Sequence, residues 1–204
     1  KRRLLYKGKR NMYMSKPQII AISGASGSGK TQLVKQLAKA YQCPSLFFDD
    51  YVDNNTYPKD MHSWFLRGAD ASQILTPRFK TKVEALQNSL WGVEFIFIEE
   101  PFCRQRASMA GLIDHVILLD TALELCLGRI MKRSLVSQQD SSSAQVIRYL
   151  ANYEAYFRDI YLHSVNKVRN NCDLVVNGNT TSEVTVNTLS DWLDSKLCLG
   201  EIML

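Results

Sequence analysis

The sequence contains no apolar run close to the roughly 20 residues that a membrane-spanning helix needs, so we expect no contact with a membrane. Its basic N-terminus is not followed by an apolar segment, which argues against a secretory signal. Cysteine is scarce as well: the chain has five, and no two of them form a C-x-x-C pair. An odd, scattered set of cysteines argues against a disulfide framework and a zinc site, and it favours a reducing, cytoplasmic location.

Acidic residues are missing from the first ten positions, where six basic residues lie together. These six account for the net charge of +5, because the rest of the chain carries 19 basic and 20 acidic residues. The body of the protein is therefore not basic, and we expect no specific nucleic-acid partner. We interpret residues 1–15 as a solvated basic arm, with contact to nucleic acid or anionic lipid as the alternative.

Repeats and domain linkers are also absent, so residues 16–204 are expected to form one domain. Short apolar runs without clean alternation recur along this domain, as in strands that are covered on both faces. These runs are Gln18–Ser23, Leu46–Phe48, Phe95–Ile98, Val116–Leu119 and Leu174–Val176. Helical segments separate them, so the pattern predicts an α/β fold: a three-layer sandwich of about five parallel strands flanked by helices.

Apolar residues at helical spacing predict two further helices, one from about Ala144 to Arg169 and one from about Ser182 to Leu197. The polar residues between Arg133 and Ala144 predict a mobile loop that joins two helices. A helix–loop–helix segment beside a phosphate site is typical of a lid, so we place a helical lid at about residues 127–145.

The most specific motif is Gly24-Ala25-Ser26-Gly27-Ser28-Gly29-Lys30-Thr31, a phosphate-binding loop of the form G-x-x-x-x-G-K-[ST]. A predicted strand precedes it, and an amphipathic segment that begins at Gln32 follows it. The glycines let successive backbone N–H groups face one anion, and the helix N-terminus adds its partial positive charge. Lys30 can reach the β- and γ-phosphates, and the Thr31 hydroxyl can bind Mg²⁺. The loop through Gln32 is therefore the predicted ATP site.

Acidic residues follow the second and third predicted strands, where ligands bind in open α/β sheets. Asp49 is the candidate that accepts a proton from a substrate hydroxyl, or binds Mg²⁺ through water. Glu99 directly ends the third run and is the expected partner of Thr31 on Mg²⁺. A solvated turn and a simple strand-end acid are the alternative interpretations.

Arg129 and Arg133 lie four residues apart after the fourth strand, so they share one face of a helix. Such a pair can stabilise the migrating phosphoryl group when a lid closes. A solvated basic face is the alternative.

Aromatic and charged residues alternate from Tyr57 to Pro77, which suits a pocket for a polyol, sugar or nucleoside. A helical hairpin that caps the sheet is the alternative. The predicted substrate-binding residues are Asp49, Tyr51, Tyr57, His62, Trp64, Arg78 and Glu99. Among these, a lone histidine is more often packed or on the surface, and Trp64 is expected to pack in part.

Taken together, these segments resemble the uridine kinase and phosphoribulokinase-like family of P-loop small-molecule kinases, over about residues 18–192. Gly24–Thr31 matches the family loop G-x-S-G-[SA]-G-K-[ST], and Asp49 matches the family's aspartate, its proposed base. Cys172–Val176 resembles the family's Ala-Asp-[VL]-[IV]-[IV] segment. The resemblance implies an ATP- and Mg²⁺-dependent kinase that phosphorylates a hydroxyl of a small metabolite, and it supports catalytic roles for Lys30 and the two arginines.

The sequence also departs from the family. The ribose motif of uridine kinases, N-[FW]-D-x-P-x-[AS], is absent, and residues 57–64 occupy its region. Glu100-Pro101-Phe102 replaces the small residue that usually follows the acid of the third strand. A subgroup of uridine kinase-like proteins of uncertain substrate carries similar Tyr-Pro-x-Asp and Glu-Glu-Pro-Phe segments. The kinase class therefore carries over, whereas uridine does not.

Two alternative functions lie outside the kinase class. A GTPase requires D-x-x-G and N-K-x-D, but no glycine follows an Asp at that spacing, and Asn166-Lys167 is followed by Val168-Arg169. A non-catalytic, ATP-binding regulatory protein with a drifted substrate site is the second alternative, favoured by the missing ribose motif. The expected partner is a hydroxylated small molecule, and a homo-oligomer is compatible with the sequence.

Overall fold

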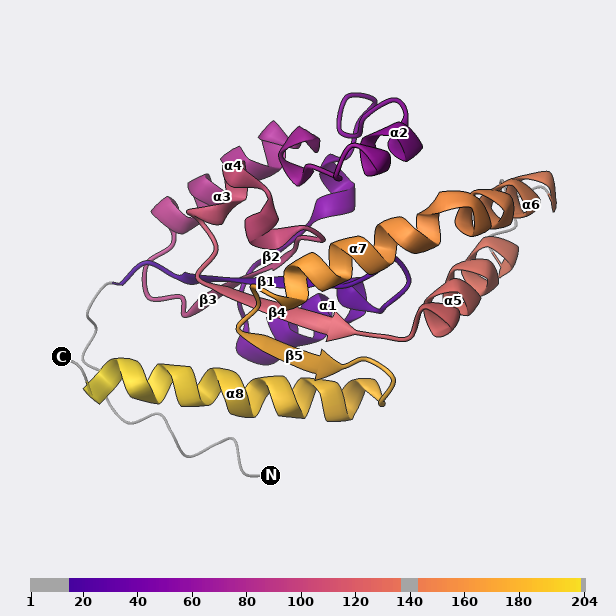
Figure 1. Cartoon of the computed structure of the whole chain (residues 1–204). Coiled ribbons are helices and arrows are strands. Elements are labelled where there is room, and N and C mark those ends of the chain that lie inside the picture. Colours follow the sequence, from indigo (N-terminus) through magenta and orange to yellow (C-terminus); the bar gives the residue numbers. More distant parts are fainter. Residues whose placement is uncertain (1–14, 137–142, 203–204) are drawn as a thin grey trace.

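A computed structural model describes residues 15–136 and 143–202, with side chains up to residue 197 (Figure 1). The predicted arm therefore lies almost entirely outside the described residues, as do residues 137–142 of the predicted lid. Within the described part, five strands form one parallel sheet in the order β2-β3-β1-β4-β5. These strands are β1 (Gln18–Ser23), β2 (Ser45–Phe47), β3 (Phe95–Glu99), β4 (His115–Asp120) and β5 (Leu174–Asn177).

The central strand β1 shows why the strands read as continuous apolar runs. Residues 19–22 have no exposed surface, because helices cover both faces of the sheet. Ile20 and Ile22 contribute to the core on one face, whereas Ile19 contributes to the core on the other. The alternation of successive side chains across a strand thus fills both cores.

Helices form the two outer layers of the fold (Figure 1). On one face, α1 (Lys30–Tyr41) and α8 (Ser182–Ile202) place Leu37 and Leu193 in the core. The other face is covered by α3 (Pro77–Ser89), α4 (Ala107–Ala110) and α7 (Arg158–Arg169). The predicted α/β sandwich of parallel strands between helical layers is confirmed. No helix among the residues described is both long and apolar enough to span a bilayer.

A third apolar cluster lies beyond the carboxyl ends of the strands. It joins α2 (Met61–Leu66) to the 3-10 turn η1 (Phe48–Tyr51), to the residues that flank the 3-10 turn η2 (Ala71–Gln73) and to Ile160 of α7, and it includes Phe48 and Trp64. The predicted second strand ended at Phe48, but the strand ends at Phe47 and Phe48 opens the turn that carries Asp49. This cluster anchors the segment that carries the acid.

The predicted helix from Ala144 to Arg169 is present but not uniform. It consists of α6 (Ser143–Asn152), a π-helical segment η4 (Tyr153–Phe157) and α7. The preceding helix, α5 (Leu123–Val136), includes residues 134–136, which we expected in the polar loop. The helix continues there because neither Gly nor Pro follows Arg133 to stop it.

Candidate active site

The loop between β1 and α1 is held in a conformation that requires glycine. Gly27 has a φ of +80° and Gly29 a φ of +105°, a region that other residues rarely adopt. A Cβ atom at Gly27 would also lie 2.4 Å from the carbonyl oxygen of Cys126 in α5. The loop ends at the N-terminus of the 12-residue helix α1, so backbone N–H groups and the helix dipole favour an anion there.

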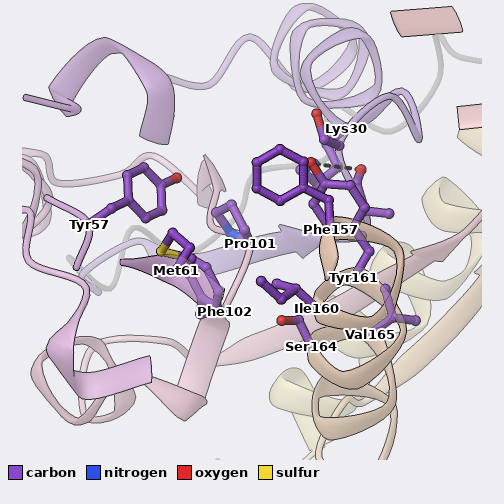
Figure 2. Close-up of a pocket in the computed structure, with 13 residues that line it drawn as sticks. Lys30, Tyr57, Met61, Pro101, Phe102, Phe157, Ile160, Tyr161, Ser164 and Val165 are labelled. Atoms are coloured by element: carbon purple, nitrogen blue, oxygen red, sulfur yellow. Dashed lines mark hydrogen bonds between the residues drawn. The ribbon is translucent and has the colours of Figure 1, made fainter. Parts of the chain in front are cut away.

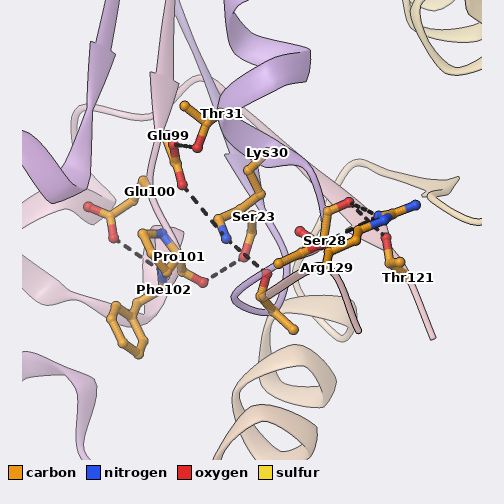
Figure 3. Close-up of polar contacts among 12 residues, drawn as sticks. Ser23, Ser28, Lys30, Thr31, Glu99, Glu100, Pro101, Phe102, Thr121 and Arg129 are labelled. Carbon is orange, nitrogen blue, oxygen red and sulfur yellow. Dashed lines mark hydrogen bonds and ion pairs between the residues drawn. The ribbon is translucent and has the colours of Figure 1, made fainter. Parts of the chain in front are cut away.

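Lys30 lies across this loop with its side chain buried (Figure 3). Its Nζ donates a hydrogen bond to the Ala25 carbonyl oxygen at 3.0 Å and lies 3.7 Å from Glu99 Oε1. Burial lowers the pKa of Lys30, while the negative charges of Glu99 and Asp49 act to raise it. The ammonium group is thus positioned among carboxylates at the mouth of the loop, where phosphate oxygens would bind.

Thr31 and Glu99 meet as the sequence predicted. The Thr31 hydroxyl donates a 2.7 Å hydrogen bond to Glu99 Oε2, and Glu99 is almost fully buried at the end of β3 (Figure 3). A hydroxyl and a carboxylate beside a phosphate cradle fit Mg²⁺, which prefers oxygen ligands and retains waters. Among the described residues no group of three or more His, Cys, Asp or Glu side chains could hold a metal, so an ion here would also need phosphate or water ligands.

A cavity of about 350 Å³ opens in front of the loop, and we call it the transfer cavity. It brings together all of the predicted catalytic and metal-binding residues. These residues are Lys30, Thr31, Asp49, Glu99, Arg129 and Arg133, from four different segments of the chain. Asp49 reaches the cavity from the turn η1, and both arginines reach it from α5. The juxtaposition of acid, lysine and loop is thus a property of the fold.

Arg129 holds the phosphate loop from outside (Figure 3). Its Nη1 donates hydrogen bonds to the carbonyl oxygens of Ser28 at 2.9 Å and Gly27 at 3.5 Å. The Thr121 hydroxyl donates to the same Ser28 oxygen at 3.2 Å. The carbonyl oxygens of Gly27 and Ser28 are therefore held by Arg129, while the N–H group of Ser28 donates within the loop to the Ala25 carbonyl oxygen at 3.1 Å.

Arg129 also lines a second cavity of about 250 Å³ on the other side of the loop. We call it the polar cavity, because Gln32, Gln36, Thr180 and Thr185 contribute to it from α1 and from the segment at β5 and α8. Of its residues, the loop, Gln32 and Arg129 belong to the predicted site. The segment after β5 was missed, since nothing in its sequence carries a nucleotide motif.

A third cavity, of about 340 Å³, shares Ser26, Lys30 and Pro101 with the transfer cavity (Figure 2). We call it the apolar cavity. Of the predicted substrate contacts, Tyr57 lines it, together with residues that the sequence did not single out for binding. These residues are Met61, Pro101, Phe102, Phe157, Ile160, Tyr161, Ser164 and Val165. Four of them lie on the stripe of the predicted long helix, which we had used only to predict the helix.

The other predicted substrate contacts outside the transfer cavity lie elsewhere. In the part of the chain that the structure describes, Tyr51, His62, Trp64 and Arg78 line none of these three cavities. Trp64 is buried in the core, and its indole N–H donates to the Asp70 carbonyl oxygen at 2.9 Å. Tyr51 packs on Phe79, His62 stacks on Tyr156, and Arg78 is exposed at the start of α3. Side chains of types that suit a pocket therefore pack against other residues or, in the case of Arg78, lie on the surface.

A buried ion pair lies behind the apolar cavity. Glu100 Oε2 is 3.2 Å from Arg106 Nη1, and neither side chain is more than 1% exposed. Arg106 Nη2 also donates to the Thr76 hydroxyl at 2.6 Å, and the backbone N–H of Phe102 donates to Glu100 Oε1 at 3.2 Å. Burial raises the pKa of Glu100 to about 7, against the opposing charge of Arg106. Glu100 lies in the Glu-Glu-Pro-Phe segment, but it was not predicted as a site residue, and Arg106 was not singled out.

Comparison with known proteins gives weak but consistent sequence matches. No family model matches the chain. It is 23% identical to a uridine kinase of Chlamydia pneumoniae over 91% of this chain and 93% of that protein. Uridine kinases of Schizosaccharomyces pombe and Saccharomyces cerevisiae are each 22% identical over at least 90% of this chain. The chain spans only 45% and 43% of these two proteins, respectively.

Solved structures share the fold at low identity. The Thermus thermophilus protein TT1252 superposes with a TM-score of 0.58 at 19% identity, covering 90% of this chain and 99% of that one. A sugar kinase from Janibacter gives 0.53 at 19% identity, covering 87% and 95%. Shikimate kinase from Aquifex aeolicus gives 0.50 at 12% identity, covering 89% and 99%. The predicted resemblance is confirmed: the chain has the fold of P-loop kinases and is similar in sequence to proteins named uridine kinase.

Proposed function

We propose that the protein transfers the γ-phosphoryl group of ATP to a hydroxyl group of a small molecule. The observation that carries this proposal is the transfer cavity, where Lys30, Thr31, Asp49 and Glu99 lie together beside the phosphate loop. The apolar cavity opens next to it and shares Lys30 with it. A phosphate donor and an acceptor bound in these neighbouring spaces would meet near the shared residues Ser26, Lys30 and Pro101, with Asp49 on the transfer side. Positioning is the main requirement of phosphoryl transfer.

ATP would bind across the phosphate loop. The loop N–H groups, Lys30 and the start of α1 suit the β- and γ-phosphates. The polar cavity adjoins the loop at Ser28 and Gly29, so it suits the nucleoside part of ATP. Thr31 and Glu99 would hold Mg²⁺, which when bound neutralises charge on the phosphates.

Asp49 would handle the proton of the transfer step. The acceptor oxygen forms a bond to the γ-phosphorus, the bond from that phosphorus to the β–γ bridging oxygen breaks, and ADP leaves. The acceptor hydroxyl passes its proton to the Asp49 carboxylate. Arg129 and Arg133 line the same cavity and would stabilise negative charge on the moving group. A cytoplasmic location and a homo-oligomer remain predictions.

The proposal is tested with Lys30→Ala and Asp49→Asn. ADP release from Mg·ATP is measured with a pool of nucleosides, sugars, polyols and aromatic alcohols as acceptors. We expect each variant to lower acceptor-dependent turnover at least about a hundredfold, because each removes a group that acts on the transferring atoms. Asp50→Asn is the matched control, since Asp50 lies in the same turn but lines none of the three cavities described.

Normal turnover by Asp49→Asn would remove this residue from the mechanism. Tight ATP binding by the natural chain, with no acceptor that stimulates ADP release, would instead indicate the non-catalytic ATP-binding alternative.

A further inference from the structure

The apolar cavity has a composition that restricts its ligand (Figure 2). Of the described residues that line it, Lys30 alone carries a charge. The Lys30 ammonium group donates to Ala25 and lies near Glu99, so it belongs to the phosphate side of the cavity. The rest of the wall is mostly aromatic and aliphatic, from α2, the segment after β3, and the region of η4 and α7.

Polar groups in this wall are few and neutral. The side-chain candidates are the hydroxyls of Ser26, Tyr57, Tyr161 and Ser164. The Tyr161 hydroxyl lies 3.3 Å from that of Tyr149, so part of its hydrogen-bonding capacity is already used. Desolvation raises the pKa of both Tyr57 and Tyr161, so both phenols stay uncharged. The cavity thus offers a small number of neutral hydroxyls and no cation beyond Lys30 among the described residues.

The wall is held in place from behind by the buried ion pair. Glu100 accepts a hydrogen bond from the Phe102 backbone, and Arg106 lies 5.3 Å from the centre of the Phe48 ring. The Phe48 ring contacts both Tyr57 and Phe102 edge-on, with centroids 6.3 and 6.2 Å apart. The two charges face each other rather than the cavity. The aromatic wall is therefore preformed, and its supporting charges are not available to a ligand.

Such a wall discriminates among acceptors by desolvation. A phosphate or carboxylate group would leave water without a cationic partner in the described wall other than Lys30. A sugar or polyol would bring more hydroxyls than the wall can pair, and each unpaired group would lose its bonds to water. A flat apolar body would instead bury its surface against Met61, Phe102 and Phe157.

We propose that the apolar cavity selects an uncharged alcohol whose hydroxyl is attached to a flat, largely apolar ring. This inference rests on the proposed kinase function, and it names the acceptor class for that reaction. It departs from the sugar, shikimate and uridine kinases to which the chain is similar, since none of those names describes an apolar alcohol.

The first test compares four acceptors with Mg·ATP: 2-(4-hydroxyphenyl)ethanol, uridine, ribitol and ribose 5-phosphate. Phosphorylated product is identified by mass spectrometry, and ADP release gives kcat/KM. We expect the aromatic alcohol to exceed each of the other three at least about tenfold. A preference for uridine, ribitol or ribose 5-phosphate would overturn the inference while leaving the kinase function intact.

A second measurement separates the two proposals. The same four compounds are titrated into the protein with a non-hydrolysable ATP analogue and Mg²⁺, and the melting temperature is recorded. Stabilisation by the aromatic alcohol without transfer would support the acceptor class and contradict the kinase function. No stabilisation by the aromatic alcohol, or stabilisation by the polar compounds alone, would overturn the acceptor class.

Two variants locate the binding in this cavity. Met61→Gln and Val165→Thr nearly conserve shape while adding polarity to the wall, so we expect the KM of the aromatic alcohol to rise about tenfold with an unchanged KM for ATP. Leu66→Gln is the control, because Leu66 is on the same helix α2 but 71% exposed. An unchanged KM in both cavity variants would place the acceptor elsewhere and overturn the inference.

Discussion

Glu99 and Glu100 are neighbours in sequence with different partners. Glu99 accepts from Thr31 in the transfer cavity, whereas Glu100 faces Arg106 in the interior. Successive side chains at a strand end point in opposite directions, so the pair divides between two sites. The small residue expected after Glu99 could not support the aromatic wall as Glu100 does.

The titration of Glu100 predicts a pH dependence of stability. Its pKa is raised from 4.5 to about 7, mainly by burial. The folded state therefore holds this proton more tightly than the unfolded state, and its stability advantage is lost as the pH rises from about 4.5 to about 7. Urea unfolding at several pH values should show the free energy of unfolding of the natural chain falling, relative to Glu100→Gln, through this window. A constant difference between the two proteins would contradict the expected titration.

Gly27 gives a second prediction at this scale. Gly27→Ala would place a Cβ against a backbone oxygen of α5 at a positive φ, so the loop must shift. We expect ATP affinity, measured by calorimetry, to fall at least about tenfold. Gly128→Ala is the matched control: Gly128 lies within α5 and has open space around it, so Ala should be neutral or stabilise the helix. Equal ATP affinities for the two variants would argue against a phosphate cradle that depends on this glycine.

At the scale of elements, the long helix of residues 143–169 both packs in the core and lines the apolar cavity. Its apolar stripe predicts burial, and Val168 does lie in the core under the sheet. Farther toward its N-terminus, Phe157 and Ile160 line the apolar cavity beside the π-helical segment. A π segment adds residues to a turn and so changes which side chains share a face. Periodicity identified the helix but not this change.

Trp64 is the buried residue of helix α2. Trp64 fills the third apolar cluster together with Phe48, the neighbour of Asp49. Trp64→Ala should lower the free energy of unfolding by about 3–5 kcal/mol in urea titrations, because the cavity it leaves cannot fully collapse. Trp91→Ala, at a residue that is 48% exposed, should change it by less than about 1 kcal/mol. Similar losses for the two variants would contradict the central role of Trp64.

At the scale of the whole molecule, nucleotide binding should couple to stability. A ligand that binds only the folded state stabilises it, by about 2.7 kcal/mol at 100 times its dissociation constant. We expect Mg·ATP to raise the melting temperature of the natural chain. Chelation of Mg²⁺ should reduce the effect, because Thr31 and Glu99 would lose the shared ion, and Lys30→Ala should reduce it further. An ATP effect that is independent of both would argue against the proposed phosphate site.

The sheet, the phosphate loop and six residues that line the transfer cavity could be predicted from the sequence, because they depend on local patterns. A Gly-rich loop between a strand and a helix has few possible geometries, and parallel strands bring their carboxyl ends to one edge. Of the substrate contacts predicted between Tyr57 and Arg78, Tyr57 lines the apolar cavity, whereas His62, Trp64 and Arg78 line none of the three cavities. Aromatic residues suit both a pocket and a core, and the sequence alone does not distinguish the two uses of Tyr57 and Trp64.

The order of residues along the chain was enough to define the chemistry of phosphate binding, since loop, lysine and threonine are consecutive. The apolar cavity arises instead from segments about a hundred residues apart, such as α2 and α7, that meet only once the sheet has formed. Its apolar character comes from aromatic and aliphatic side chains of these helices, and such side chains are normally buried against a sheet or another helix. In the folded chain some of these side chains face the apolar cavity beside Lys30. The local sequence does not show which of them will do so, because this depends on how distant segments pack together.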